Sequence, residues 1–184
     1  MKFLPLAVAA ALLAEPAFAQ QVVAAQSEIG FVSKQMGVPV EGKFKQWTAQ
    51  INFDPKKPDG GKVAFTIQTG SAAFGSPETD AEVPKATWFN VAKFPQASFA
   101  SSGIKALGGG KFEVRGKLNI KGATQDAVVP VTVTQAGAAS TATGSFVVKR
   151  LDFKIGEGEW ADTSMVANDV TVKFKLALTG MAPL

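Results

Sequence analysis

Apolar and polar residues alternate most strictly between Lys111 and Ile120. Every second residue there is apolar or glycine, and the residues between them are charged or amidic. A period of two is typical of a β-strand with one buried face and one face in water. The apolar face consists of Phe112, Val114, Gly116, Leu118 and Ile120. This segment therefore predicts a strand of an antiparallel sheet.

The same pattern recurs, less regularly, along most of the chain. Turn signals rich in Gly, Pro, Asn and Asp separate the apolar runs at intervals of roughly a dozen residues, which is typical of a β-barrel or sandwich. The expected strands are 22–34, 42–54, 62–69, 96–107, 111–120, 126–135, 139–151 and 169–179. The last strand is as amphipathic as the inner ones, so we expect closure into a single antiparallel eight-stranded β-barrel. Such a barrel encloses either packed side chains or one slender ligand.

Two irregularities interrupt the strand pattern. Phe44 is out of phase with the apolar residues that follow it, which predicts a bulge or bend near Lys45-Gln46. Pro130 lies within a Val-rich strand but has no N–H to donate to a neighbouring strand. We therefore expect a bulge or a weak seam in the barrel wall at Pro130.

An aromatic connector, residues 87–102, separates the first strands from the later ones. Before it, Ser76 followed by Pro77 predicts a short helix that ends at about Pro84 or Trp88. The connector contains Trp88, Phe89, Phe94 and Phe99. Large rings are rarely left in water, so we expect them at the mouth or in the interior of the barrel. The connector thus joins the two halves of the barrel.

The first nineteen residues have the pattern of a signal peptide. An apolar run, residues 3–14, precedes the small-x-small sequence Ala17-Phe18-Ala19. The run is shorter than the roughly 20 residues that a membrane span needs. The alternative is an uncleaved anchor, which Glu15 disfavours because it ends the run early. We expect cleavage after Ala19 and one mature domain, residues 20–184.

The composition excludes several classes of protein. The chain has no Cys, His or Tyr and a net charge of +4 that is scattered along the sequence. Disulfides, thiolate metal sites and Ser-His-Asp catalysis are therefore absent, and no basic stripe indicates nucleic-acid binding. We expect no cofactor and no metal. The remaining catalytic hypothesis is a hydrolase or isomerase that uses Asp80 with Glu82 or Glu157 with Glu159, and we expect that the protein is not an enzyme.

Four groups of segments, in order along the chain, resemble the YceI-like family of periplasmic polyisoprenoid-binding proteins. The segments are Ile29-Gly30-Phe31 with Met36-Gly37-Val38 and Gly42-Lys43-Phe44; Asp80 with Trp88-Phe89-Asn90 and Phe94-Pro95-Gln96-Ala97-Ser98-Phe99; Gly116 to Thr124; and Arg150-Leu151-Asp152-Phe153 with Gly156 to Trp160 and Val166 to Val172. The resemblance implies a lipocalin-like barrel with one or two short helices in its connectors. It also implies a periplasmic, non-catalytic protein that holds a polyisoprenoid, quinone-like or fatty-chain lipid.

The expected ligand-binding residues form an apolar tunnel. They are Phe31, Phe65, Ile67, Trp88, Phe89, Phe94, Phe99, Phe112, Val114, Leu118, Phe146, Val148, Trp160, Phe174 and Leu176. From periodicity alone the same residues fit a solid core equally well. Arg150 is a candidate head-group contact, because guanidinium suits phosphate and carboxylate, and its alternative is a structural ion pair with Asp152.

The expected partner is a long-chain isoprenoid or acyl lipid, and no nucleic acid. Further candidates are transient contact with a membrane or an envelope redox protein, and a dimer. The alternative function is a structural or interaction module of the cell envelope with a filled barrel and no ligand.

Overall fold

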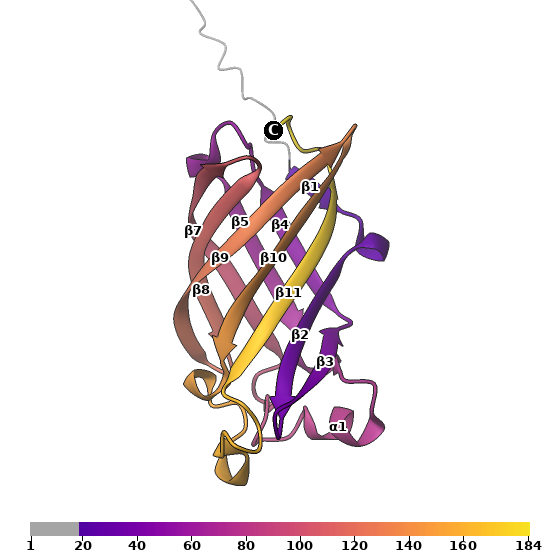
Figure 1. The fold of residues 1–184 in the computed structure, drawn as a ribbon, viewed down its shortest axis with the longest axis vertical. Coiled ribbons are helices and arrows are strands. Elements are labelled where there is room, and N and C mark those ends of the chain that lie inside the picture. The colour runs from indigo at the N-terminus through magenta and orange to yellow at the C-terminus, as the bar shows by residue number, and fades with distance from the viewer. Residues whose placement is uncertain (1–18) are drawn as a thin grey trace, which may run out of the picture.

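The computed structural model describes residues 19–184, which form one antiparallel sheet closed into a barrel (Figure 1). The predicted signal peptide lies outside the described residues, except for Ala19. The strands are β1 (Ala19–Val22), β2 (Glu28–Gln35), β3 (Val38–Phe44), β4 (Trp47–Asn52), β5 (Lys62–Gln68), β6 (Ala72–Ala73), β7 (Gln96–Gly108), β8 (Lys111–Ile120), β9 (Ala123–Ala136), β10 (Ala139–Lys149) and β11 (Asp169–Thr179). The helical elements are α1 (Pro77–Glu82) and the 3₁₀ turns η1 (Ala24–Gln26), η2 (Pro58–Gly60), η3 (Thr69–Ser71), η4 (Arg150–Phe153) and η5 (Gly158–Ala161).

The strand order confirms the predicted eight-stranded barrel. Neighbours run β1-β4-β5-β7-β8-β9-β10-β11-β2-β3-β6, and β1 also pairs with β11. Once β3 and β4 are taken as one bent strand and the short β1 and β6 are set aside, eight strands remain. The bent strand closes the ring, because β3 pairs with β2 and β4 pairs with β5, and β1 bridges β11 and β4 at one end of the barrel.

The predicted bend at Lys45-Gln46 is confirmed, and it moves the chain between two neighbours. β3 ends at Phe44 and pairs with β2, whereas β4 starts at Trp47 and pairs with β5. The prediction of a single strand over 22–34 is wrong, because η1 divides it into β1 and β2. Such short pairing segments lack a periodic pattern of their own, so alternation alone does not separate them.

The predicted weak seam at Pro130 is confirmed on one side of its strand. The β8–β9 ladder runs without a break through the pair Glu113↔Pro130. The β9–β10 ladder, in contrast, ends at Gly144↔Val131, directly beside Pro130. The carbonyl oxygen of Pro130 faces Gly144, so the position where Pro130 has no N–H also faces β10. Beyond it β9 and β10 separate towards the α1 end of the barrel (Figure 1).

Three inward glycines let phenylalanine rings lie against the barrel wall. A Cβ added at Gly42 would lie 2.4 Å from Cζ of Phe31, one at Gly116 would lie 2.6 Å from Cζ of Phe99, and one at Gly144 would lie 2.3 Å from Cζ of Phe174. Each ring therefore occupies the space that a side chain on the adjacent strand would need. In this way a chain with 14 phenylalanines keeps part of its interior open.

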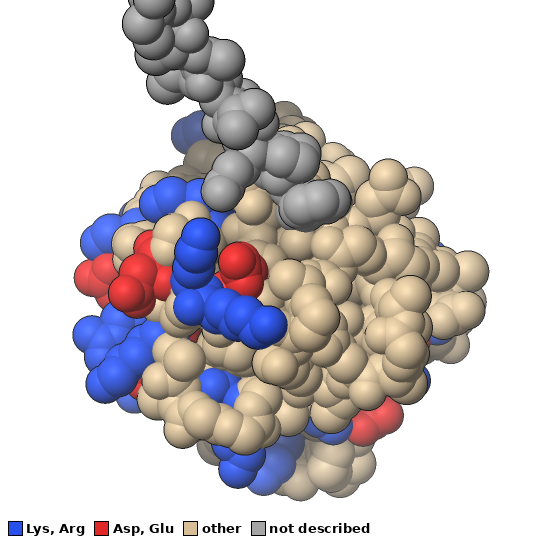
Figure 2. All heavy atoms as spheres, turned by 90° about the horizontal axis from the view of Figure 1, so that it is seen from above, with Lys and Arg blue, Asp and Glu red and all other residues tan. Residues whose placement is uncertain are grey.

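The barrel end opposite α1 is covered by the C-terminal tail. The amide of Gln135 donates to the carbonyl of Ala182 and accepts from the N–H of Leu184. Figure 2 views this end, and most of its charged side chains gather on one side while uncharged atoms cover much of the rest. No helix among residues 19–184 has the length and apolar character to cross a membrane.

Candidate functional site: a two-part apolar cavity

The barrel interior contains an inner cavity of about 130 Å³ at the end covered by the tail. Its wall is made by the inward residues of the strands, together with Met181 from the tail. All 21 lining residues are apolar: Ile29, Ile51, Phe53, Val63, Phe65, Ile67, Phe99, Ile104, Phe112, Val114, Leu118, Val129, Val131, Val133, Ala142, Phe146, Val172, Phe174, Leu176, Leu178 and Met181. A dry apolar void of roughly 150 Å³ is large enough for a benzene ring. The inner cavity therefore has room for a thin apolar chain end.

An outer cavity of about 640 Å³ lies at the α1 end of the barrel. Its volume falls in the range of roughly 300–1,000 Å³ that is usual for ligand sites. Its apolar lining includes Phe31, Phe44, Phe74 and Phe89. Val83, the residue that follows α1, also belongs to this lining. Its polar lining is Ser33, Gln35, Glu78, Thr79, Glu82, Arg150 and Glu159. The site therefore changes from fully apolar to partly polar towards the α1 end.

The two cavities share four wall residues, namely Ile67, Leu118, Phe146 and Val172. These residues come from four different strands, β5, β8, β10 and β11. They form a ring at which the inner and outer cavities meet. The two cavities are therefore adjacent inside the barrel, the smaller at the end covered by the tail and the larger at the α1 end.

The residues predicted to line a tunnel all line one of the two cavities, except Phe94. The ring of Phe94 packs instead against Gly122, and the ammonium of Lys93 lies 5.3 Å from its centre. Sequence reasoning missed Phe44, Phe74, Val83 and Met181, among others. Phe74, Val83 and Met181 lie in loops or the tail, where no alternation marks an inward face, and Phe44 is the last residue of β3, out of phase with the strand that follows.

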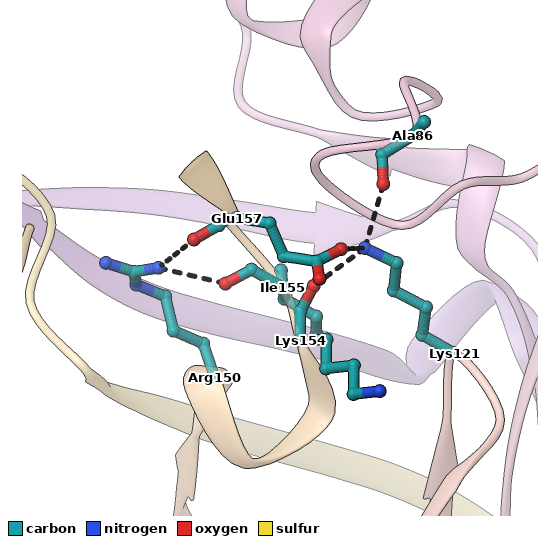
Figure 3. A network of polar contacts seen from close by, with 7 residues as sticks. Ala86, Lys121, Arg150, Lys154, Ile155 and Glu157 are labelled. Atoms are coloured by element: carbon teal, nitrogen blue, oxygen red, sulfur yellow. Dashed lines mark hydrogen bonds and ion pairs between the residues drawn. The ribbon is translucent and has the colours of Figure 1, made fainter. Parts of the chain in front are cut away.

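The loops that cover the outer cavity are joined through Lys121 in the β8–β9 turn (Figure 3). Its Nζ donates to the carbonyl oxygens of Ala86 and Lys154 and to Oε2 of Glu157, at 2.8, 2.7 and 2.8 Å. An ammonium group has three N–H donors, so all of them are used. Lys121 thus connects its own turn to Ala86, directly before the aromatic connector, and to the loop between β10 and β11.

Arg150 stabilises the β10–β11 loop from inside and is only 2 % exposed. Its five N–H donors each meet a backbone carbonyl, at 2.6 to 3.2 Å. The acceptors belong to Ile155, Gly156, Trp160, Val166 and Ala167. Burial lowers the pKa of the guanidinium, because desolvation disfavours its charged form.

Arg150 therefore matches neither sequence interpretation in full. It has no N–H left for a head group, and among the ion pairs of residues 19–184 there is none between it and Asp152. Its role is structural, but it stabilises the loop by donating to backbone carbonyl groups rather than by forming an ion pair. Arg150 holds the loop that carries Trp160, whose ring centre lies 5.6 Å from that of Trp88.

Three of the four carboxylates considered for catalysis make structural contacts, and the fourth, Glu159, lines the outer cavity. Oδ1 of Asp80 accepts a hydrogen bond of 2.6 Å from the N–H of Phe74. Glu82 pairs with Lys85, and Glu157 pairs with Lys121, which lowers the pKa of Glu157 through a hydrogen bond and the attraction of opposite charges. These contacts give the hydrolase hypothesis no support. Within residues 19–184 no three His, Cys, Asp or Glu side chains form a group suited to a metal ion.

Comparison with known proteins adds a family to this geometry. The crystal structure of Burkholderia cenocepacia BcnA is 45 % identical and superposes with a TM-score of 0.83, over 85 % of this chain and 99 % of that one. A polyisoprenoid binding domain from Saccharophagus degradans, implicated in plant cell wall breakdown, is 16 % identical with a TM-score of 0.71, over 89 % of this chain and 99 % of that one. At that identity the second likeness shows the fold alone.

Curated relatives match a shorter part of the chain. Protein YceI of Salmonella arizonae is 38 % identical over 92 residues, which is 50 % of this chain and 46 % of that protein. The chain spans about half the length of the curated relatives it matches. The model of the YceI-like domain matches residues 20–178, nearly all of the barrel. The chain therefore belongs to the YceI-like family.

Proposed function

We propose that this chain is an exported, non-catalytic carrier that holds one long apolar lipid inside its barrel. The lipid is a polyisoprenoid, a quinone-like lipid or a fatty chain. The observation that carries the proposal is the pair of adjacent cavities, of which the inner one is lined by apolar residues only. Removing apolar area from water is worth about 25 cal/mol per Å², so a chain that fills both parts is held without any specific bond.

Two further points support this proposal. The Saccharophagus degradans domain, which is described as polyisoprenoid binding, shares the fold. The signal pattern favours export to the periplasm and cleavage after Ala19, which leaves β1 and its closing pairs nearly complete. Transient contact with a membrane belongs to the proposal, because the lipid has to be collected from one.

The test is native mass spectrometry of the mature protein, purified from its own envelope and then extracted with solvent. We expect an added mass of one lipid that extracts as an isoprenoid or acyl compound. A variant at the ring between the cavities, Val172→Phe, should lose the lipid or retain only shorter chains. Val128→Phe is the matched control, because Val128 faces outward and is 52 % exposed.

The competing function is an interaction module of the cell envelope. It requires a filled barrel, and the two cavities argue against one. A clean protein mass, together with failure of added isoprenoid and acyl lipids to bind, would favour the module over the carrier.

A further inference from the structure

The inward face of β2 becomes polar as it approaches the α1 end of the barrel. Ile29 lines the inner cavity, and Phe31, Ser33 and Gln35 follow at every second position along the wall of the outer cavity. Ser33 is 7 % exposed and is one of the few polar residues buried in the barrel. Its hydroxyl has no hydrogen-bond partner among residues 19–184, although it lines a cavity. The hydroxyl oxygen is accessible from the cavity, so a molecule bound there can supply the missing hydrogen-bond partner.

The charges around the outer cavity are mostly negative. Three carboxylate residues line it, namely Glu78, Glu82 and Glu159, and Glu82 is paired with Lys85. Hydrogen bonds from its own backbone N–H and from Ser76 lower the pKa of Glu78, which stays ionised at neutral pH. Among residues 19–184, Arg150 is the one cation in the wall, and all its N–H donors are bonded to carbonyls. An anionic head group would therefore meet three carboxylates, and Arg150 has no N–H donor left to bind it.

We infer that the outer cavity selects lipids with an uncharged, oxygen-bearing head group, and that Ser33 is the residue that binds this oxygen. The hydroxyl of Ser33 can donate to a carbonyl or exchange hydrogen bonds with an alcohol. Phosphate, diphosphate and carboxylate head groups are disfavoured. This inference rests on the proposed function, since it concerns the head group of a lipid whose chain lies in the barrel.

The experiment compares three probes of similar hydrocarbon character on the whole mature protein. They are squalene, which has no polar atom, geranylgeraniol, which has one hydroxyl, and geranylgeranyl diphosphate. We expect geranylgeraniol to bind at least about tenfold more tightly than the diphosphate. Equal or tighter binding of the diphosphate would overturn the inference.

Ser33→Ala tests the assigned residue. We expect the affinity for geranylgeraniol to fall by about fivefold to tenfold relative to that for squalene, as the loss of one hydrogen bond predicts. The matched control is Ser145→Ala, an exposed position on β10 that should leave the ratio unchanged. An unchanged ratio in Ser33→Ala, with the unfolding midpoint of the wild type, would refute the role of Ser33.

A second pair of substitutions tests the charge argument. Glu78→Gln with Glu159→Gln should raise the affinity for the diphosphate, whereas the alcohol should respond much less. No gain for the diphosphate would count against selection by charge. The failures are distinguishable: if none of the three probes binds, the carrier function itself is wrong, whereas squalene binding without head-group selectivity refutes only the inference.

Discussion

The ammonium group of Lys121 lies 2.8 Å from the carboxylate of Glu157, although the lysine side chain is only 5 % exposed and the glutamate is 48 % exposed. The contact joins the β8–β9 turn to the loop that follows β10. It crosses the seam at which β9 and β10 no longer pair. A backbone connection is missing there, and a charged hydrogen bond takes its place. Lys121 also has a positive φ of 50°, which is unusual for a side chain of its size.

Lys121→Met should destabilise the protein by about 2–3 kcal/mol. The substitution keeps the apolar stem but leaves Glu157 and two backbone carbonyls without their donor. Urea unfolding measures the loss. Lys117→Met is the control, because Lys117 forms an exposed pair with Asp126 on the same hairpin and should cost less than about 0.5 kcal/mol. Equal losses in both variants would show that Lys121 acts as an ordinary surface lysine.

The same contact predicts how stability depends on pH. The pKa of the Glu157 carboxyl is lowered from its ordinary value of 4.5, first through its hydrogen bond to Lys121 and then through the charge of Lys121. A carboxyl whose pKa is lower in the folded state stabilises the fold above the unfolded pKa and loses this effect as the pH falls through the folded pKa.

Its contribution should therefore be complete at neutral pH and disappear below pH 4.5. Glu157→Gln should be less stable than the wild type at pH 7, and the difference should narrow on acidification. Unfolding midpoints measured from pH 7 to pH 3 test this. Glu78 and Asp162, whose pKa values are also lowered, contribute equally to both proteins and cancel in the comparison. A difference that is independent of pH would contradict the assignment.

The β2–β3 turn has the same pair of positive φ angles as the turn at Lys121 and Gly122, but no hydrogen bond of its first side chain is found within residues 19–184. Met36 and Gly37 have φ values of 47° and 79°, as the two central residues of a type I′ hairpin turn do. This turn favours Asn at its first position, whereas Met36 is strained there and 80 % exposed. Met36→Asn should therefore raise the free energy of unfolding by about 0.5–1 kcal/mol. Thermal unfolding measures the gain, and a lower midpoint would show that the side chain of Met36 stabilises the fold.

The sequence predicts the barrel well because its long strands alternate. The strand Lys111–Ile120, the bend after Phe44 and the seam at Pro130 all follow from local rules on period, phase and missing donors. The residues that bridge the barrel ends and complete the site cannot be predicted from such local rules. β1 and β6 are too short to show a period, and Met181 reaches the inner cavity from a tail whose position depends on Gln135.

The polar part of the site is less accessible to sequence reasoning. Arg150 resembles an anion-binding residue by type, and only the fold shows that loop carbonyls occupy all its donors. Ser33 carries no sequence signal, since one serine among small residues has many roles. The role proposed for Ser33 depends on the cavity in front of it and on the lack of a hydrogen-bond partner for its hydroxyl among residues 19–184, which are properties of the closed barrel.

The absence of a side chain at Gly144 leaves room for the ring of Phe174, which lines the inner cavity. A Cβ at this position would lie 2.3 Å from Cζ of Phe174 and 2.5 Å from the carbonyl oxygen of Pro130, which is backbone and cannot turn away. In Gly144→Ala the ring of Phe174 therefore has to move into the cavity, or β9 has to separate further from β10. We expect a loss of about 1–3 kcal/mol in stability, together with weaker binding of squalene.

Gly103→Ala is the matched control for Gly144→Ala. Gly103 lies at the bulge in β7, where a Cβ meets no atom within 4 Å and φ is not positive. This variant should remain within about 0.5 kcal/mol of the wild type and bind squalene as the wild type does. If Gly144→Ala is equally harmless, the ring of Phe174 has room elsewhere. The glycines would then not be the reason that the barrel is open, and the cavity would have to be explained by the splayed seam between β9 and β10 alone.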